Sequence, residues 1–127
     1  MKFLLLMYAE EGVWPPEEHA LAVQESVAVC QELHDKGQYL SAAPLQPPST
    51  AACVRVREGK TVVTDGPFAE TKEQLGGYFL IEAADIAEAI GIAARLPGPR
   101  RGVAEVRPVM EVPNLPVSIP HADQQQA

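Results

Sequence analysis

Cysteine and histidine are scarce in this sequence of 127 residues, which contains two cysteines and three histidines. Cys30 and Cys53 have no CxxC spacing, so we expect two small buried hydrophobic side chains rather than a disulfide or a metal-binding pair. The histidines are scattered along the chain, and neither cysteine has an identifiable base near it in the sequence. The sequence therefore predicts no metal, no cofactor and no nucleophilic cysteine.

Lysine and arginine residues are also few. Ten lysine and arginine residues stand against seventeen acidic ones, which gives a formal net charge of −7 and a pI near 4.9. Because nucleic-acid binding needs a stripe of lysine or arginine to neutralise phosphates, we expect no direct binding to nucleic acid. The cluster of Arg95, Arg100 and Arg101 is interpreted as a solvated connection between a helix and a strand, with an anion site as the less favoured alternative.

Long hydrophobic runs are absent as well. No apolar stretch approaches the roughly 20 residues of a membrane-spanning helix, so we expect a cytoplasmic protein without a membrane partner. The apolar run from Phe3 to Ala9 is followed at once by Glu10 and Glu11, without the cleavage pattern of a signal peptide, and is typical of a buried strand. Gly76 and Gly77 lack the surrounding residues of a phosphate-binding loop, and there is no GxSxG motif for serine catalysis.

Several segments nevertheless have clear strand patterns. Residues 3–8 and 78–81 are apolar on both faces, which predicts the two central strands of a sheet. Residues 54–57 and 61–64 alternate between apolar and polar around Glu58-Gly59, which predicts a hairpin with one polar face. Shorter strands are expected over residues 38–43 and 103–107.

Two helices are predicted between these strands. The first begins at Pro15-Pro16 with acidic residues in its first turn and ends at Gly37, and its predicted buried stripe is Ala20, Val23, Val27, Cys30 and Leu33. The second begins at Asp85, which stands three residues before Glu88 as in a helix cap, and it ends at Pro97. Its predicted apolar residues are Ile86, Ile90, Ala93 and Leu96.

The order of these elements predicts an α+β fold, a ferredoxin-like sandwich whose antiparallel sheet carries two helices on one face and an added β-hairpin. Because the other face of such apolar strands needs a cover, we expect a homodimer with sheets packed face to face, of the dimeric α/β-barrel type. Residues 1–112 form the predicted domain. Residues 113–127, rich in proline and glutamine, are expected to be a mobile tail or an arm lying on the partner.

The segment Thr64–Tyr78, TDGPFAETKEQLGGY, contains a turn, four charged side chains and two aromatic ones between two apolar runs. With KFLLLMY, LQPP, VRVREGK and EVRPVME, it resembles the DGPF branch of the YCII-related proteins over about residues 1–112. The resemblance implies a dimeric ferredoxin-like fold. Relatives in the wider family carry a His and an Asp proposed as a catalytic pair, and Asp35 stands at the Asp position, but Ser26 lies near the expected place of the His.

His19 and His34 are the available substitutes for that histidine, although neither spacing from Asp35 is typical of a catalytic pair. His19 is interpreted as a solvated residue of the first helical turn, and His34 as a partner of the helix dipole. Asp65-Gly66 predicts a turn in which the carboxylate accepts downstream amides. This structural interpretation is favoured over a catalytic one, in which Asp65 or Glu70 is a general base at a pocket mouth.

The candidate catalytic residues are therefore Asp35, Asp65 and Glu70. Candidate ligand-binding residues are aromatic or charged groups in the signature segment or at strand ends, namely Tyr8, Phe68, Lys72, Glu73, Tyr78 and Arg107. Phe68 is expected to anchor the loop. Lys72 binds a substrate anion or pairs with a neighbouring glutamate, and Arg107 has the alternative of pairing with Glu105 or Glu111.

Two functions remain open. The first is a small-molecule binder or enzyme in which the three carboxylates transfer protons, as in isomerisation of a small carbonyl compound, a reaction class suggested by fold analogy alone. The alternative is a regulatory protein-interaction module, for which the resemblance implies an extracytoplasmic-function sigma factor as partner. A third interpretation gives the signature segment a purely structural role in the fold and the dimer.

Overall fold

A computed structural model describes residues 1–116 of the chain, so most of the predicted tail, 113–127, lies outside the described residues. The element order is β1 (Lys2–Glu10), α1 (Pro16–Asp35), β2 (Tyr39–Pro44), η1 (Pro48–Thr50), β3 (Ala52–Arg57), β4 (Lys60–Asp65), β5 (Glu73–Glu82), α2 (Ile86–Arg95), η2 (Gly98–Arg100) and β6 (Gly102–Pro108). Within residues 1–116, neither α-helix is long and apolar enough to cross a membrane.

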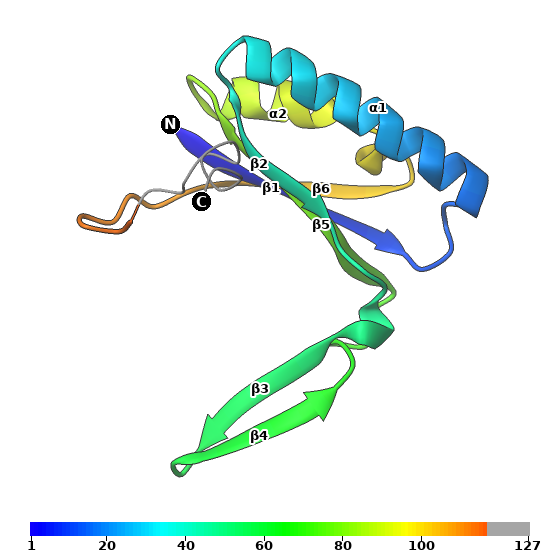
Figure 1. The fold of residues 1–127 in the computed structure, drawn as a ribbon, viewed down its shortest axis with the longest axis vertical. Coiled ribbons are helices and arrows are strands. Elements are labelled where there is room, and N and C mark those ends of the chain that lie inside the picture. Colours follow the sequence, from blue (N-terminus) through cyan, green and yellow to red (C-terminus); the bar gives the residue numbers. More distant parts are fainter. Residues whose placement is uncertain (117–127) are drawn as a thin grey trace, which may run out of the picture.

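The main sheet has the strand order β2-β5-β1-β6, with every neighbouring pair antiparallel. Both predicted central strands, β1 and β5, occupy the middle, and both helices lie over one face of the sheet (Figure 1). This arrangement confirms the predicted ferredoxin-like α+β fold. The signature segment is less of a loop than predicted, because β5 already begins at Glu73.

The core lies between the helices and this sheet. Phe3 and Leu5 of β1 and Ile81 of β5 are fully buried, and they pack in one cluster with Leu33 of α1 and Leu96 after α2. The pairing register of β1 and β5 explains why these side chains are buried together. Phe3 pairs with Ile81, and paired residues of an antiparallel ladder point to the same face.

The predicted buried stripes of the two helices are only partly correct. Val23 and Val27 of α1 are 37% and 49% exposed, and in α2 the isoleucines Ile86 and Ile90 are exposed whereas Ala89, Ile92 and Ala93 are buried. Ala20 is also exposed. Helical periodicity identifies side chains that share one face of a helix, but whether these side chains are buried depends on the surface that packs against that face.

Helix α2 begins with the predicted reciprocal cap. The Asp85 carboxylate accepts a hydrogen bond from the Glu88 amide at 2.9 Å, and the Glu88 carboxylate accepts one from the Ala84 amide at 2.9 Å. Asp85→Ala is therefore expected to destabilise the protein by about 1 kcal/mol and to lower the melting temperature by about 4 °C. Thermal unfolding followed by circular dichroism measures this, and equal melting temperatures for Asp85→Ala and the acceptor-retaining Asp85→Asn would contradict it.

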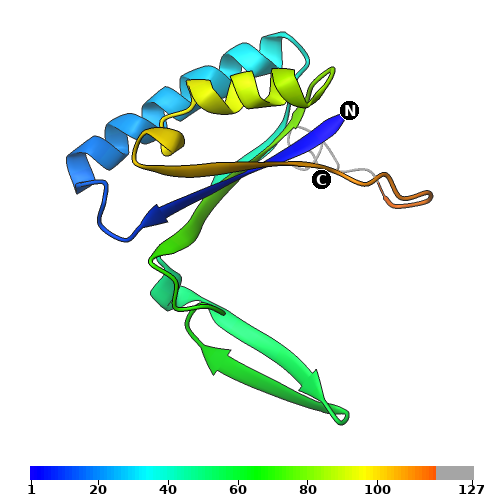
Figure 2. The same ribbon diagram turned by 180° about the vertical axis from the view of Figure 1, so that it is seen from behind.

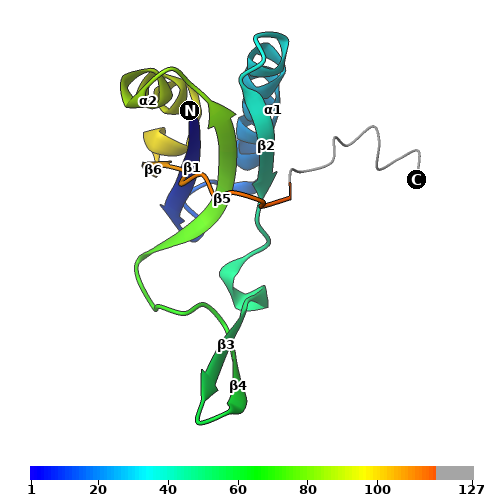
Figure 3. The same cartoon turned by 90° about the vertical axis from the view of Figure 1, so that its left-hand side faces the viewer.

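The predicted hairpin is present as a separate two-stranded sheet of β3 and β4. Its turn is formed by Glu58 and Gly59, with φ angles of 52° and 75°, the left-handed pair that suits the twist of a two-residue hairpin. Figure 2 shows the hairpin extending away from the rest of the domain. Figure 3 shows the hairpin continuing beyond the ends of β2 and β5 that lie farther from the helices.

Candidate functional site: a cavity between α1 and the sheet

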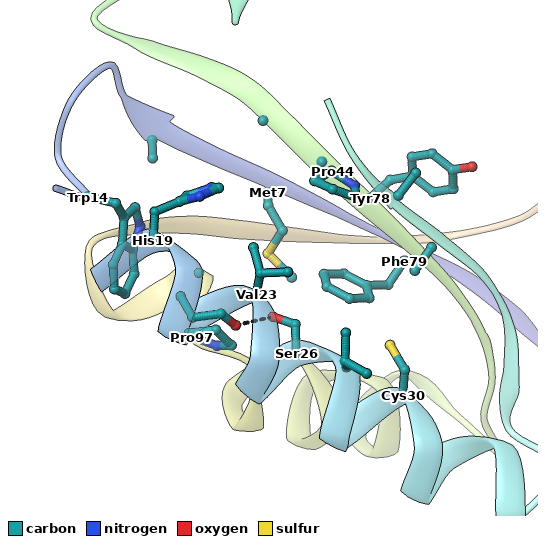
Figure 4. Close-up of a pocket in the computed structure, with 18 of the residues that line it drawn as sticks. Met7, Trp14, His19, Val23, Ser26, Cys30, Pro44, Tyr78, Phe79 and Pro97 are labelled. Atoms are coloured by element: carbon teal, nitrogen blue, oxygen red, sulfur yellow. Dashed lines mark hydrogen bonds between the residues drawn. The ribbon is translucent and has the colours of Figure 1, made fainter. Parts of the chain in front are cut away.

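A cavity of about 520 Å³ lies between α1 and strands β1, β2 and β5 (Figure 4). One wall is a continuous stripe of α1 whose members recur every three or four residues, and it includes His19, Ala22, Val23, Ser26, Cys30 and His34. This spacing puts all six on one face of the helix. The valines that sequence periodicity assigns to the core therefore line the cavity.

The cavity exists because the opposite wall consists largely of small residues. Ala42 and Ala43 of β2 lie beside Gly76 and Gly77 of β5, and none of them carries a side chain long enough to fill the space below α1. Gly77 also permits close strand pairing, because a Cβ atom there would lie 3.1 Å from the Ala43 carbonyl oxygen. The glycines that end the signature segment thus border the cavity.

A bulge in β5 at Gly76 shapes the same wall where β5 pairs with β1. The pairing of β1 with β5 shifts between Met7 and Tyr8, so that Met7 faces Gly77 while Tyr8 pairs with Leu75. A bulge bends its strand and redirects side chains. Figure 4 shows Met7 and Phe79 pointing into the cavity toward Val23.

Trp14 borders the cavity where the chain enters α1. The Arg101 guanidinium lies 4.3 Å from the centre of the Trp14 ring, a cation–π contact, and donates to the two Glu18 carboxylate oxygens at 2.9 and 3.1 Å. A bidentate arginine–carboxylate pair fixes the geometry of both side chains. The loop before α1 is therefore tied to the segment before β6.

The arginine cluster pairs with three glutamates of α1. Besides the Arg101–Glu18 pair, Arg100 contacts Glu25, and Arg95 contacts Glu32. The glutamates are two helical turns apart, so they form one line along α1. The cluster runs from Arg95, the last residue of α2, to Arg101, the residue before β6. Its guanidinium groups contact α1 and so hold one side of that helix, while the neighbouring side faces the cavity.

The Glu18–Arg101 pair predicts a stability change in acid. Hydrogen bonds and positive charge from Arg101 lower the pKa of Glu18 below its ordinary value of 4.5. Since the folded pKa is below the unfolded one, the pair stabilises the fold above the unfolded pKa, and this contribution is lost as pH falls through the folded pKa. Glu18→Gln is expected to lower the melting temperature at neutral pH, with the difference from the wild type vanishing once the pH has fallen below the folded pKa of Glu18.

The measurement is a series of melts across that pH range at low salt. Glu17→Gln is the matched control, since Glu17 lies beside Glu18 and no ion pair with it occurs within residues 1–116. A difference between wild type and Glu18→Gln that persists unchanged in acid would contradict the assignment.

Neutral polar groups are scattered over the cavity walls. The Ser26 hydroxyl donates to the Ala22 carbonyl at 2.9 Å, which leaves its oxygen able to accept a hydrogen bond. Burial raises the pKa of the Cys30 thiol and of the Tyr39 hydroxyl, so both are neutral at physiological pH. Among the described residues, no Asp, Glu, Lys or Arg lines this cavity.

The structure places two of the predicted ligand-binding residues, Tyr8 and Tyr78, at the cavity wall. The Tyr78 ring, however, points away from the cavity in Figure 4, and its hydroxyl lies 3.4 Å from the Ser41 hydroxyl. Of the predicted catalytic carboxylates, Asp35 comes nearest. Its Oδ1 is 3.9 Å from Nδ1 of His34, which lines the cavity.

The other two predicted catalytic residues, Asp65 and Glu70, are exposed and do not line the cavity. Within residues 1–116, the Asp65 carboxylate accepts no hydrogen bond from a downstream amide, so the turn depends on Gly66, whose φ is 92° and whose amide donates to the Ala51 carbonyl at 2.7 Å. Phe68 does not pack into its own subunit, because it is 78% exposed with Arg55 over its ring, so its anchoring role across an interface stays a prediction.

The remaining predicted residues gather at the sheet face that the helices leave open. Tyr8, Lys72 and Glu73 line a second, shallow hollow together with Val103 and Glu105 of β6. Lys72 pairs with Glu10 at 3.2 Å, and Arg107 pairs with Glu105, the surface alternatives given above. The Glu105 carboxylate raises the pKa of Arg107, which stays charged.

Sequence reasoning missed Trp14, Tyr39 and Phe79 as cavity residues, and it interpreted His19 as merely solvated. The available signal was the coincidence of two patterns. A helix stripe of medium-sized apolar residues faces two runs of small residues, SAAP and LGGY, and small residues on both strands leave the stripe without packing partners.

Comparison with known proteins identifies a matching family model and a related protein. The family model described as YCII-related domain matches residues 1–113. An uncharacterized protein of Rhizobium meliloti (strain 1021) is 40% identical over 114 residues, a match that covers 86% of this chain and 92% of that protein.

Proposed function

Because this chain belongs to the YCII-related family and has a cavity between α1 and its sheet, we propose that it is a dimeric protein that binds a small molecule in that cavity. The observation that carries the proposal is the cavity itself. At about 520 Å³ it falls in the range of sites for small ligands, which are concave, mostly apolar and supplied with a few polar groups.

The chemistry of the walls favours an elongated, mainly apolar ligand without a strong charge. The cavity follows α1 from His19 to His34, and its middle is lined by Met7, Val23 and Phe79. An ionised ligand would lose its hydration without gaining an opposite formal charge from an Asp, Glu, Lys or Arg side chain at the wall. The Ser26 and Tyr39 hydroxyls supply hydrogen bonds to one or two polar atoms of the ligand.

Dimerisation is supported by the uncovered face of the sheet. Leu4 and Leu6 of β1 pair with Leu80 and Tyr78 of β5, and these side chains lie on the face away from the helices. Val103 of β6 is exposed on the same face. A second sheet packed face to face would remove this apolar surface from water.

Proton transfer is the proposed chemistry where the bound molecule reacts. His34 lines the cavity and lies 3.9 Å from Asp35, so this pair supplies a base at the cavity wall with a carboxylate beside it. Asp65 and Glu70 belong to the signature segment and lie away from the cavity of their own chain. A role for them in catalysis requires that a partner subunit bring them to the ligand.

A thermal-shift screen tests the binding proposal. Neutral aromatic compounds, lactones and phenols are expected to raise the melting temperature, while phosphorylated metabolites are not, since a ligand stabilises only by binding the folded state preferentially. Asp35→Asn and an Asp65→Asn, Glu70→Gln double variant are included. Stabilisation by phosphorylated metabolites alone would overturn the proposed ligand class.

The same variants separate binding from chemistry. We expect both to keep ligand binding, since none of the three carboxylates lines the cavity, and we expect Asp35→Asn to lose turnover of any compound that the wild type converts. Full turnover by Asp35→Asn and by the double variant would remove the acid–base proposal and leave a binding protein.

A further inference from the structure

Among residues 1–116, the β3–β4 hairpin makes no ladder with the other strands. Its two strands pair there only with each other, and every residue of β4 is exposed. In Figures 1 and 2 it projects beyond the main sheet on the side opposite the helices. An isolated two-stranded hairpin is marginally stable at best in water, so the hairpin needs a surface to pack against.

One face of the hairpin is apolar and exposed. Val54 pairs with Val63, and Val56 lies on the same face two residues further along β3. These three side chains are 63%, 60% and 61% exposed. We call them the valine face. Three exposed valines in a row on a projecting element are typical of a contact surface.

The opposite face of the hairpin is positively charged. Arg55 pairs with Val62 and Arg57 pairs with Lys60, so all three cations of the hairpin share this face. The chain as a whole carries a net charge of −7, so its other parts are strongly acidic. An acidic second copy of the chain would attract these cations at long range, which favours association although the valine face, and not the charged face, makes the proposed contact.

We propose that the β3–β4 hairpin is an arm that clasps a second copy of this chain, with the valine face packed against the partner. The inference rests on the face-to-face dimer of the proposed function. In Figure 1 the arm lies on the side of the sheet opposite the helices, where the partner's sheet would lie, so a partner covering Leu4, Leu6 and Leu80 meets the arm as well. The clasp adds to the area that the sheet faces bury, and a stable interface needs about 800 Å² per partner.

The clasp would also explain the amino-acid composition of the signature segment. Asp65 ends the arm, and Phe68, which follows it, is highly exposed with Arg55 over its ring. Exposure of a phenyl group to water is energetically unfavourable. Its burial at a protein–protein interface is favourable, and aromatic side chains are enriched at such interfaces.

Sedimentation velocity of the full chain over a range of concentrations tests the arm. The first variant replaces residues 52–65 by a short Gly-Ser link. The structure permits it because the Gly66 amide donates to the Ala51 carbonyl at 2.7 Å, so the two ends of the arm are adjacent. The second variant, Val54→Thr with Val63→Thr, keeps the β-branched shape but makes the valine face polar.

Val62→Thr is the matched control, because Val62 lies in the same hairpin on the charged face and is 46% exposed. We expect the deletion and the double valine variant each to raise the dimer dissociation constant by about tenfold or more, while Val62→Thr leaves it within about twofold of the wild type. Circular dichroism confirms that each variant is folded.

The outcomes separate the two proposals. A wild-type dimer whose dissociation constant is unchanged in both arm variants overturns the clasp and leaves the sheet-face dimer standing. A wild type that stays monomeric at high micromolar concentration overturns both. An arm that instead binds a different protein, with the dimer unaffected by the arm variants, also overturns the clasp.

Discussion

Gly102→Ala is expected to lower the melting temperature by about 8 °C or more, corresponding to a loss of about 2 kcal/mol or more of unfolding free energy. Gly102 begins β6 and pairs with Ala9 of β1. A Cβ atom added there would overlap the Tyr8 carbonyl oxygen and lie 3.1 Å from the Ala9 Cβ. The overlap is with backbone, which cannot move aside without breaking the pairing of β1 and β6. Thermal unfolding followed by circular dichroism measures the loss.

Gly91→Ala is the matched control and should change the melting temperature in the opposite direction. Gly91 lies within α2, and an added Cβ there meets no atom within 4 Å. Alanine in an exposed helical position is more stable than glycine by about 0.5–1 kcal/mol, so the melting temperature should rise. Equal effects of the two substitutions would mean that β6 does not approach β1 as described.

Ala22→Trp is expected to abolish ligand binding without unfolding the protein. Ala22 lines the cavity from α1, and an indole buries about 150–250 Å², so it would occupy the space that a ligand needs. For the neutral apolar probe N-phenyl-1-naphthylamine, we expect the dissociation constant to rise by about 100-fold or more, or about 2.7 kcal/mol. Fluorescence titration of the probe measures it.

Ala28→Trp provides the matched control for this substitution. Ala28 is on the same helix but is exposed and does not line the cavity. Its replacement should leave probe binding within about twofold of the wild type. Equal binding by the two tryptophan variants would show that the probe binds elsewhere.

The local rules that the sequence obeys account for most of the fold. The doubly apolar strands β1 and β5 lie in the middle of the sheet, the cap at Asp85 begins α2, and Glu58-Gly59 forms the hairpin turn. Each of these signals depends on neighbouring residues or on a simple alternation, which is why it can be read without a structure.

The cavity was not predicted, since it depends on which surfaces meet. Val23 and Val27 have the spacing of core residues, and only the presence of Gly77 and Ala42 on the facing strands leaves them unpacked. The positions of the carboxylates in the signature segment could not be predicted for a related reason. The carboxylates Asp65 and Glu70 are close to the GGY residues in sequence, but Asp65 ends the arm, Glu70 lies in the connection from the arm to β5, and neither lines the cavity that GGY borders.

The most direct test of the central claim is an NMR titration of the ¹⁵N-labelled protein with N-phenyl-1-naphthylamine. The account predicts saturable binding, with amide shift changes concentrated at Ser26, Cys30 and Gly77 around the cavity. Absence of saturable binding, or shift changes confined to the β3–β4 arm and the open face of the sheet, would contradict a small-molecule site between α1 and the sheet.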